Sequence, residues 1–343
     1  MVICASATPI FTDIDRACLR CGLCLHGCPA RSAAEVSAAE LWAALSRPTA
    51  PYLAAIVLAS LVHMGCSALK WRTVMRRVAP AESDAAGLRF FMFYSCLGGA
   101  LAQFLTVHLS TLLVRGLAAR LHHRVPFARG AATSIYEQGF DVLVLLIVGF
   151  ATAAALALGW DLWAWLGLVA VSLLAVAAGL GWLAGAAAQR AAGGSGSVRR
   201  HLPFGRLGRW LDQCLDSGVL EARVLFSLYG LSLLRYLAMF ARALLIAHSV
   251  GLAAPLADVT LAFPIVQASQ IIALTPGSLG IVEWTWSGVL VAMGHGFTEV
   301  VGFALALRIL AYASVLVVLA GAALAFVVGR RSLEVPPSPP TAA

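Results

Sequence analysis

Charged side chains inside otherwise apolar stretches are the residues of this sequence best placed to do chemistry. Glu137 and Asp141 are four positions apart and so share one face of a helix, and Arg235 and Arg242, seven apart, do the same. Two further ionisable residues of this kind are Glu283 and Arg308. A charge at the centre of a bilayer costs about 3 kcal/mol or more. These residues therefore predict either ion pairs around a polar cavity that holds a charged headgroup, or pairs that only fix helix register.

Catalytic motifs do not accompany these charges. The sequence contains no nucleophile elbow, no P-loop and no metalloprotease helix motif. It also has no polar stretch large enough for a synthase or kinase domain. His108 and His248 lie in apolar stretches, where we expect hydrogen-bonded structural histidines. We therefore predict that this chain is not an enzyme.

A cysteine run near the N-terminus is the second group with possible chemistry. Cys18, Cys21, Cys24 and Cys28 are followed directly by a proline. This spacing is typical of thiolates that wrap a cubane iron–sulfur cluster, and it resembles one half of a two-cluster bacterial ferredoxin. In such a ferredoxin the fourth cysteine serves the other cluster, and no second run exists here. A complete 4Fe–4S site would need Cys4, a strained use of Cys28, or exchange across a homodimer.

Other interpretations of this cysteine run are disulfides or idle thiols, and a misassigned start or fused fragment. Zinc is disfavoured because its sites usually take two separated Cys-x-x-Cys pairs. The charge distribution described below puts residues 1–48 outside the cell, where thiols oxidise and clusters are not normally loaded. An iron–sulfur cluster on this run would make the chain a membrane-anchored electron-transfer protein, which is our secondary hypothesis.

The composition predicts the elements that must position these residues. Of 343 residues, 61% are hydrophobic and only 12% are charged, with a mean hydropathy of +0.88. Soluble domains carry about 25% charged residues, so the soluble Rossmann, barrel and sandwich classes are excluded. We predict an all-α integral membrane protein, a polytopic bundle of about six to eight hydrophobic segments. The segments lie near residues 50–69, 90–114, 131–157, 162–188, 224–250, 259–274, 279–297 and 302–328.

Three regions follow from this pattern. Residues 1–48 form a Cys-rich N-terminal segment that ends in an amphipathic helix near 33–46. Residues 49–329 form the transmembrane domain. Residues 330–343 are a Pro-rich tail that we expect to be disordered.

The positive residues predict the topology. Of the 24 lysines and arginines, 17 lie in or beside four connections, four lie in the N-terminal segment and three lie inside spans. The four connections cover residues 70–89, 115–130, 190–223 and 330–331. Basic connections stay in the cytoplasm, so we predict a multi-pass protein of the inner or plasma membrane with a cytoplasmic C-terminus. The net charge of +8 then reflects topology and attraction to lipid surfaces, and no nucleic-acid partner is expected.

The same charge rule makes segment 90–114 re-entrant. The basic residues before and after it must lie on one side of the membrane, so this segment must enter and return. Gly98 and Gly99 offer the break, and the residues that follow are too polar to face lipid.

A second hairpin is predicted near the C-terminus. Residues 251–258 carry no cation and Arg330 lies inside, so only one net crossing fits between them. Residues 259–297 are then a hairpin with its tip at 275–278, followed by one full span. Broken segments that enter from opposite faces are typical of transporters. The alternative is two ordinary short spans whose topology departs from the charge rule.

The predicted tip also carries a family resemblance. Residues 273–283 read ALTPGSLGIVE and, with the later Arg308, resemble the Pro-Gly-Gly-x-Gly-x-x-Glu segment and arginine of the lysylphosphatidylglycerol synthase transmembrane family, also called flippase-like. Upstream, Trp71-Arg72 resembles its Trp-Arg span end. Residues 103–115 occupy the place of its glycine-rich segment ending in arginine, and residues 136–141 are similar to its Glu-Arg-x-x-Asp helix.

This resemblance covers roughly residues 50–328 and departs from the family at a few positions. Ser278 replaces a glycine and Gln138 replaces the arginine. Residues 103–115 lack the family's proline and paired glycines.

The resemblance implies a helical fold with re-entrant helices and a role in moving or handling lipids, such as flipping an aminoacylated phospholipid. The aminoacyl-transferring domain is absent, so synthase activity is not implied. Membrane lipids are the expected partners, with a homodimer as a further possibility and a non-catalytic scaffold as a third hypothesis. The expected substrate-binding residues, in a cavity between the two hairpins, are Glu283, Arg308, Glu137, Asp141, Arg115, Pro276, Gly277 and Gly280.

Overall fold

A computed structural model describes residues 38–80, 86–192, 219–272 and 275–331. All regular elements of these residues are helical, which confirms the predicted all-α class. Among them, five helices are long and apolar enough to cross a membrane. These are α4 (Ala50–Val78), α8 (Phe127–Leu158), α9 (Leu162–Ala192), α11 (Ala222–Val250) and α14 (Phe297–Arg331). A short helix, α3 (Ala38–Ser46), precedes α4 in the region predicted to be amphipathic.

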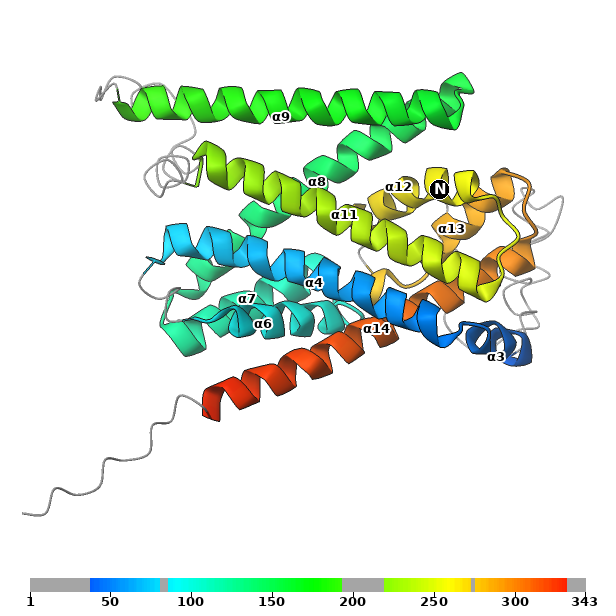
Figure 1. The fold of residues 1–343 in the computed structure, drawn as a ribbon, viewed down its shortest axis with the longest axis horizontal. Coiled ribbons are helices and arrows are strands. Elements are labelled where there is room, and N and C mark those ends of the chain that lie inside the picture. Colours follow the sequence, from blue (N-terminus) through cyan, green and yellow to red (C-terminus); the bar gives the residue numbers. More distant parts are fainter. Residues whose placement is uncertain (1–37, 81–85, 193–218, 273–274, 332–343) are drawn as a thin grey trace, which may run out of the picture.

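The shorter helices form two hairpins in opposite halves of the bundle (Figure 1). The first pairs α6 (Leu88–Leu101) with α7 (Val107–His123). The second pairs α12 (Leu256–Ile272) with α13 (Ile281–Ala292), and the 3₁₀ turn η2 (Pro276–Ser278) lies between them. At 1.5 Å per residue all four helices are shorter than the apolar layer of about 30 Å. The structure therefore has the two broken segments that the charge rule predicted.

The break in the first hairpin lies at residues 102–106, and the predicted break at Gly98 and Gly99 is wrong. Thr106 begins α7, and its side chain accepts a hydrogen bond from the backbone N–H of Leu109. The two glycines lie within α6, where they allow close packing. A Cβ on Gly99 would lie 2.8 Å from Cε of Met64 on α4.

Helix α4 continues well past the predicted end of its segment at residue 69. No residue between Lys70 and Val78 disfavours a helix, and the first proline after Lys70 is Pro80. Lys70, which the sequence placed in a basic connection, is therefore inside the bundle with no exposed surface. Arg115, assigned to the next basic connection, is likewise buried, in α7.

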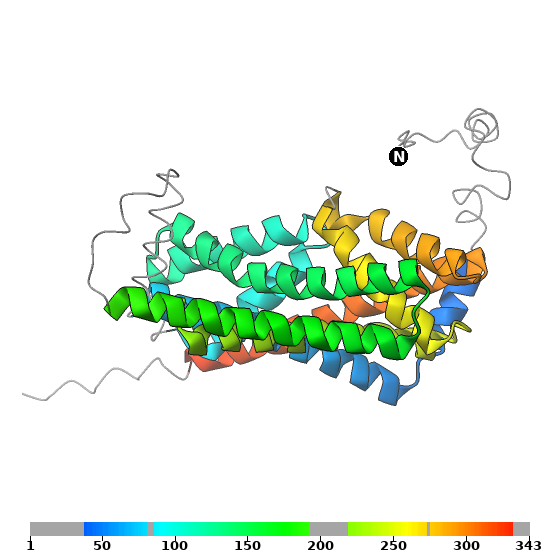
Figure 2. The same cartoon turned by 90° about the horizontal axis from the view of Figure 1, so that it is seen from above.

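The helices that hold the polar interior are α4, α8 and α11, together with the hairpin of α6 and α7. Helix α4 packs along α11 and also contacts α6, α8 and α14. Helix α9 packs on α8 and α11 at the side of the bundle (Figure 2), and its large side chains Trp163 and Trp182 are exposed. It therefore contributes little to the interior.

The two ends of the bundle differ in charge. The chain passes from α4 to α6 and from α7 to α8 at one end, where α11 also begins, whereas α8–α9, α11–α12 and α13–α14 connect at the other (Figure 1). The first end carries one described carboxylate, Glu221, and seven arginines: Arg76, Arg77, Arg89, Arg120, Arg124, Arg129 and Arg223. The other end carries Arg47, Asp161, Asp258 and Glu299. This asymmetry fits the predicted topology, in which the first end is cytoplasmic.

Candidate functional site

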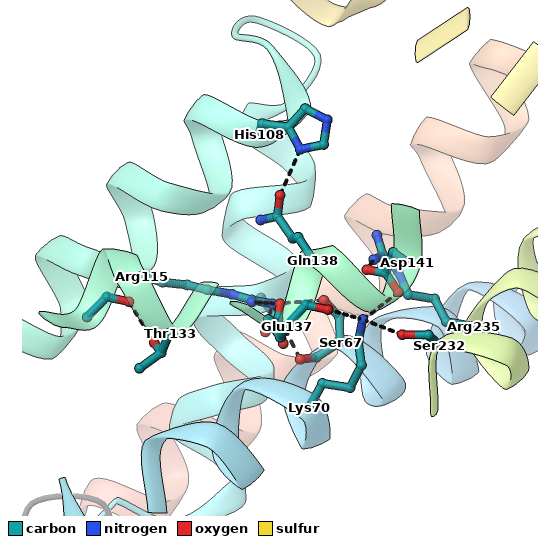
Figure 3. Close-up of polar contacts among 12 residues, drawn as sticks. Ser67, Lys70, His108, Arg115, Thr133, Glu137, Gln138, Asp141, Ser232 and Arg235 are labelled. Carbon is teal, nitrogen blue, oxygen red and sulfur yellow. Dashed lines mark hydrogen bonds and ion pairs between the residues drawn. The ribbon is translucent and has the colours of Figure 1, made fainter. Parts of the chain in front are cut away.

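A cavity of about 230 Å³ lies between the hairpin of α6 and α7, helix α12 of the second hairpin, and the long helices α4, α8, α11 and α14. Ionisable residues on its wall are Arg115, Glu137, Asp141, Arg235 and Arg242, with the histidines His63 and His108. Figure 3 shows how most of these side chains converge. The cavity thus brings together three of the predicted site residues, Arg115, Glu137 and Asp141.

Arg115 and Glu137 form an ion pair deep in the protein. Each side chain is only 1% exposed. Arg115 also donates to Oγ of Ser67 at 2.8 Å and to Oγ of Ser95 at 3.1 Å. The ring centroid of Trp71, one turn after Ser67 on α4, lies 5.0 Å from the guanidinium carbon. The pair is therefore held by contacts from four helices, α4, α6, α7 and α8.

Asp141 is shared by two cations. Nζ of Lys70 donates to its Oδ1 at 2.5 Å, and Arg235 pairs with its Oδ2. Lys70 also donates to Oγ of Ser232 at 3.0 Å, which joins α4, α8 and α11 at one point. The Lys70 side chain is fully buried, whereas those of Asp141 and Arg235 are 21% and 19% exposed. One carboxylate therefore balances two cations at a point that the cavity reaches.

Arg242 lies on the same side of α11 as Arg235, two turns further along. It donates to Oγ of Ser60 at 3.1 Å, and Ser60 shares a hydrogen bond of 2.7 Å with Ser314 of α14. Among the residues that the structure describes, no carboxylate pairs with Arg242.

These charges lie near the middle of the bundle. Asp141 and Arg235 are each 13 or more residues from both ends of their helices. This corresponds to about 20 Å of helix on either side. The cavity thus lies at the depth where an unpaired charge is most costly.

A second polar cluster joins the tips of the two hairpins. Glu283 pairs with Arg308 and accepts a hydrogen bond of 2.9 Å from the backbone N–H of Gly280. Arg308 donates in turn to the carbonyl of Gly277. The backbone N–H of Gly277 donates to the carbonyl of Leu105 in the first hairpin at 3.0 Å.

The predicted site residues therefore separate into two neighbouring clusters. Glu283 and Arg308 are not on the cavity wall and belong to the hairpin junction, with Gly277 and Gly280. Pro276 begins the turn η2 at this junction. Gln103 links the two clusters, because it lines the cavity and its backbone touches Gly277.

Sequence reasoning missed Lys70, which pairs with Asp141 of the cavity wall. It was assigned to a connection because the first apolar stretch ends after about 20 residues. A periodic pattern could have found it. Ser60, His63, Ser67 and Lys70 follow one another at three- and four-residue intervals, and so form a polar stripe along one face of α4.

His108 and His248 are hydrogen-bonded, as the sequence led us to expect. Nδ1 of His108 lies 2.7 Å from Oε1 of Gln138, the residue that replaces the family's arginine. Nδ1 of His248 lies 2.9 Å from the hydroxyl of Tyr52. No group of three or more His, Cys, Asp or Glu side chains that could hold a metal occurs within the described ranges. The cysteine run at Cys18–Cys28 lies outside those ranges.

Comparison with known families gives one result. The family model described as the lysylphosphatidylglycerol synthase TM region matches residues 27–321. This range contains the cavity, both hairpins and their junction. A search of curated proteins and a search of solved structures found no match. Nothing in these comparisons supports the ferredoxin resemblance of the cysteine run.

Proposed function

Because the chain belongs to the lysylphosphatidylglycerol synthase TM region family, we propose that its central cavity binds the charged headgroup of a membrane lipid and carries it between the two leaflets. The family match itself indicates a lipid-related role in the membrane. Since the match is to the transmembrane region, the proposal concerns the movement of a lipid and not its synthesis.

The observation that carries this proposal is the charged cavity at mid-depth. A lipid headgroup that crosses the apolar layer without protein must leave water, at a cost of many kcal/mol for its charges. A wall with the partly exposed Asp141, Arg235 and Arg242 offers polar partners at the point where this cost is greatest. The acyl chains would remain in lipid while the headgroup passes.

The broken helices beside the cavity support the same proposal. Non-helical backbone at membrane depth is tolerated where it lines a cavity or is buried in protein. The two hairpins reach the interior from opposite ends of the bundle and meet at Gly277 and Leu105, next to the cavity. Each hairpin could therefore close the path from one side of the membrane. No described residue favours the electron-transfer or scaffold hypotheses in a comparable way.

Filling the cavity without changing its charge should block transport. Leu145 lines the cavity, whereas its neighbour Leu146 on the same helix is 44% exposed on the outer surface. In proteoliposomes with a leaflet-resolved assay of charged lipids, Leu145→Trp should slow headgroup exchange about tenfold or more. This loss corresponds to about 1.4 kcal/mol of added barrier. Leu146→Trp, the matched control, should exchange lipid at the wild-type rate. Equal rates in the two variants would argue against passage through this cavity.

The proposed orientation can be tested by labelling. In a chain with all eight native cysteines replaced, single cysteines are introduced as Arg129→Cys and Ala253→Cys at opposite ends of the bundle. Both positions are exposed. In intact cells a membrane-impermeant maleimide should label the cysteine at 253 and leave that at 129 unlabelled until the membrane is permeabilised. The reverse pattern would overturn the assignment of the basic end to the cytoplasm.

A further inference from the structure

The charges around the cavity do not balance. In the described part of the chain, four cations lie on the cavity wall or pair with a residue of the wall, and two carboxylates lie on the wall with them. They are Lys70, Arg115, Arg235 and Arg242 against Glu137 and Asp141. Glu137 is taken by Arg115, and Asp141 is shared by two cations. The cluster thus has a surplus of two positive charges, and Arg242 has no carboxylate partner among the described residues, at a depth where unpaired charge is costly.

The surplus lies on one side of the cavity, between α4 and α11. These helices pack along each other in opposite directions, as their contacts show: Lys70 meets Ser232 near one end and Ser60 meets Arg242 further along. Arg242 meets α4 at Ser60, and Arg235, two turns before it on the same side of α11, pairs with Asp141 of α8. His63, one turn after Ser60, lies on the same stripe of α4 and lines the same cavity.

Two buried nitrogens on this side, Nε of Arg235 and Nδ1 of His63, have no hydrogen-bond partner among the described residues. The first is a donor, and the second donates when it carries the ring proton. His63 as a whole is only 6% exposed, so bulk water does not solvate it. Within the described ranges, Arg242 makes one hydrogen bond, to Ser60, from its five N–H groups. A buried N–H group without an acceptor destabilises the protein unless a ligand accepts its hydrogen bond.

From this arrangement we infer that His63, Arg235 and Arg242 form a seat for a phosphate group, and that the cavity prefers headgroups with net negative charge. Arginine donates in a planar fork that fits two phosphate oxygens at once. A bound phosphate would neutralise the surplus charge and accept hydrogen bonds from the unpartnered nitrogens. An aminoacylated headgroup would instead bring a further cation toward a cavity wall where cations already outnumber carboxylates.

The phosphate seat is inferred from the residues of the cavity. The further step, that the phosphate belongs to a lipid, rests on the proposed function. A lipid phosphodiester and free inorganic phosphate share the chemistry that these donors recognise. The test must therefore separate the two sources.

Binding can be measured by native mass spectrometry of the purified full-length chain with equal amounts of phosphatidylglycerol and phosphatidylcholine. The wild type should retain phosphatidylglycerol about tenfold in preference. Arg242→Gln should lower this preference about tenfold, the loss expected for one charge-assisted hydrogen bond. Arg242→Lys should keep part of it, because the charge remains without the fork. Arg77→Gln, which removes an exposed arginine paired with Glu221 at the end of α4, is the control and should leave the preference unchanged.

A second variant keeps the test valid if Arg242→Gln does not fold. Arg235→Gln leaves Lys70 and Asp141 as a balanced pair, so the fold should persist while the seat loses a donor. Inorganic phosphate added at millimolar concentration identifies the source. If inorganic phosphate competes with phosphatidylglycerol, the seat is open to water. If it does not compete and the lipid preference is intact, the seat is filled only by lipid. Equal retention of both lipids by the wild type, or an unchanged preference in Arg235→Gln and Arg242→Gln, would overturn the inference.

Failure of this inference and failure of the proposed function give different results. If lipid exchange depends on the open cavity in the Leu145→Trp experiment but shows no preference for anionic headgroups, the phosphate seat alone is wrong. If phosphatidylglycerol is retained selectively but no lipid moves between leaflets, the seat stands as a binding site and transport is wrong.

Discussion

Replacing Gly277 with alanine is expected to separate the tips of the two hairpins and to destabilise the protein by about 3 kcal/mol. Gly277 has a positive φ of 62°, which costs other residues about 1–2 kcal/mol. A Cβ at this position would lie 2.4 Å from the carbonyl oxygen of Gln103. Because that atom is backbone, the clash can be relieved only by moving the first hairpin, and overpacking of this kind costs about 1–3 kcal/mol. The hydrogen bond from Gly277 to Leu105 would be lost with it.

Gly159→Ala is the matched control for this prediction. Gly159 follows α8 with φ 63° and ψ 31°, in the same left-handed region as Gly277, but a Cβ there would meet nothing within 4 Å. It should therefore show only the backbone cost of about 1–2 kcal/mol. Thermal unfolding in detergent measures both variants, and the leaflet assay should show slower exchange for Gly277→Ala. If the two variants unfold at the same temperature, the contact between the hairpins contributes nothing to stability.

The second large effect concerns the buried pair of Arg115 and Glu137. Replacing either residue with glutamine leaves the other charge buried without its partner, so each single variant should lose about 3–5 kcal/mol of stability. The double variant removes both charges and should be less destabilised than the sum of the two single variants. Each side chain is 1% exposed, so water cannot replace the missing partner without a rearrangement of the helices.

An exposed ion pair provides the comparison for this cycle. Arg77 and Glu221 are 36% and 50% exposed, and loss of either should change stability by about 1 kcal/mol or less. All the variants can be compared by thermal unfolding in the same detergent. Additive losses in the buried pair, or losses as small as those at Arg77, would show that Arg115 and Glu137 do not depend on each other.

Ser278 and Gln138, the two residues that depart from the resembled motifs, each have a physical consequence in the structure. Ser278, which replaces a glycine, has a positive φ of 55° at the hairpin tip. Glycine takes this conformation at least cost, which explains why the resembled segment has it there. Gln138, which replaces the arginine, hydrogen-bonds His108 and removes one more cation from the cavity wall. In this chain a strained serine thus stands at the hairpin tip, and a hydrogen bond to His108 replaces a charge on the cavity wall.

The sequence by itself determined the class of the fold and the presence of two broken segments. Apolar length predicted the spanning helices, because about 20 residues of helix are needed to cross the layer. The distribution of cations predicted two returning segments, because basic connections must share one side. Both properties are local or additive along the chain, so they can be read without knowing which helices touch. The turn at 275–278 followed from the same reasoning.

Only the tertiary structure decided which charges meet. Asp141 contacts Lys70 and Arg235, 71 and 94 positions away, and Glu137 contacts Arg115 rather than any of the three predicted arginines. These choices depend on how each helix is rotated and on how far α4 extends, and both are set by packing among segments that are distant in the sequence. The charges therefore divided into a cavity and a hairpin junction, which helical periodicity along a single segment cannot reveal.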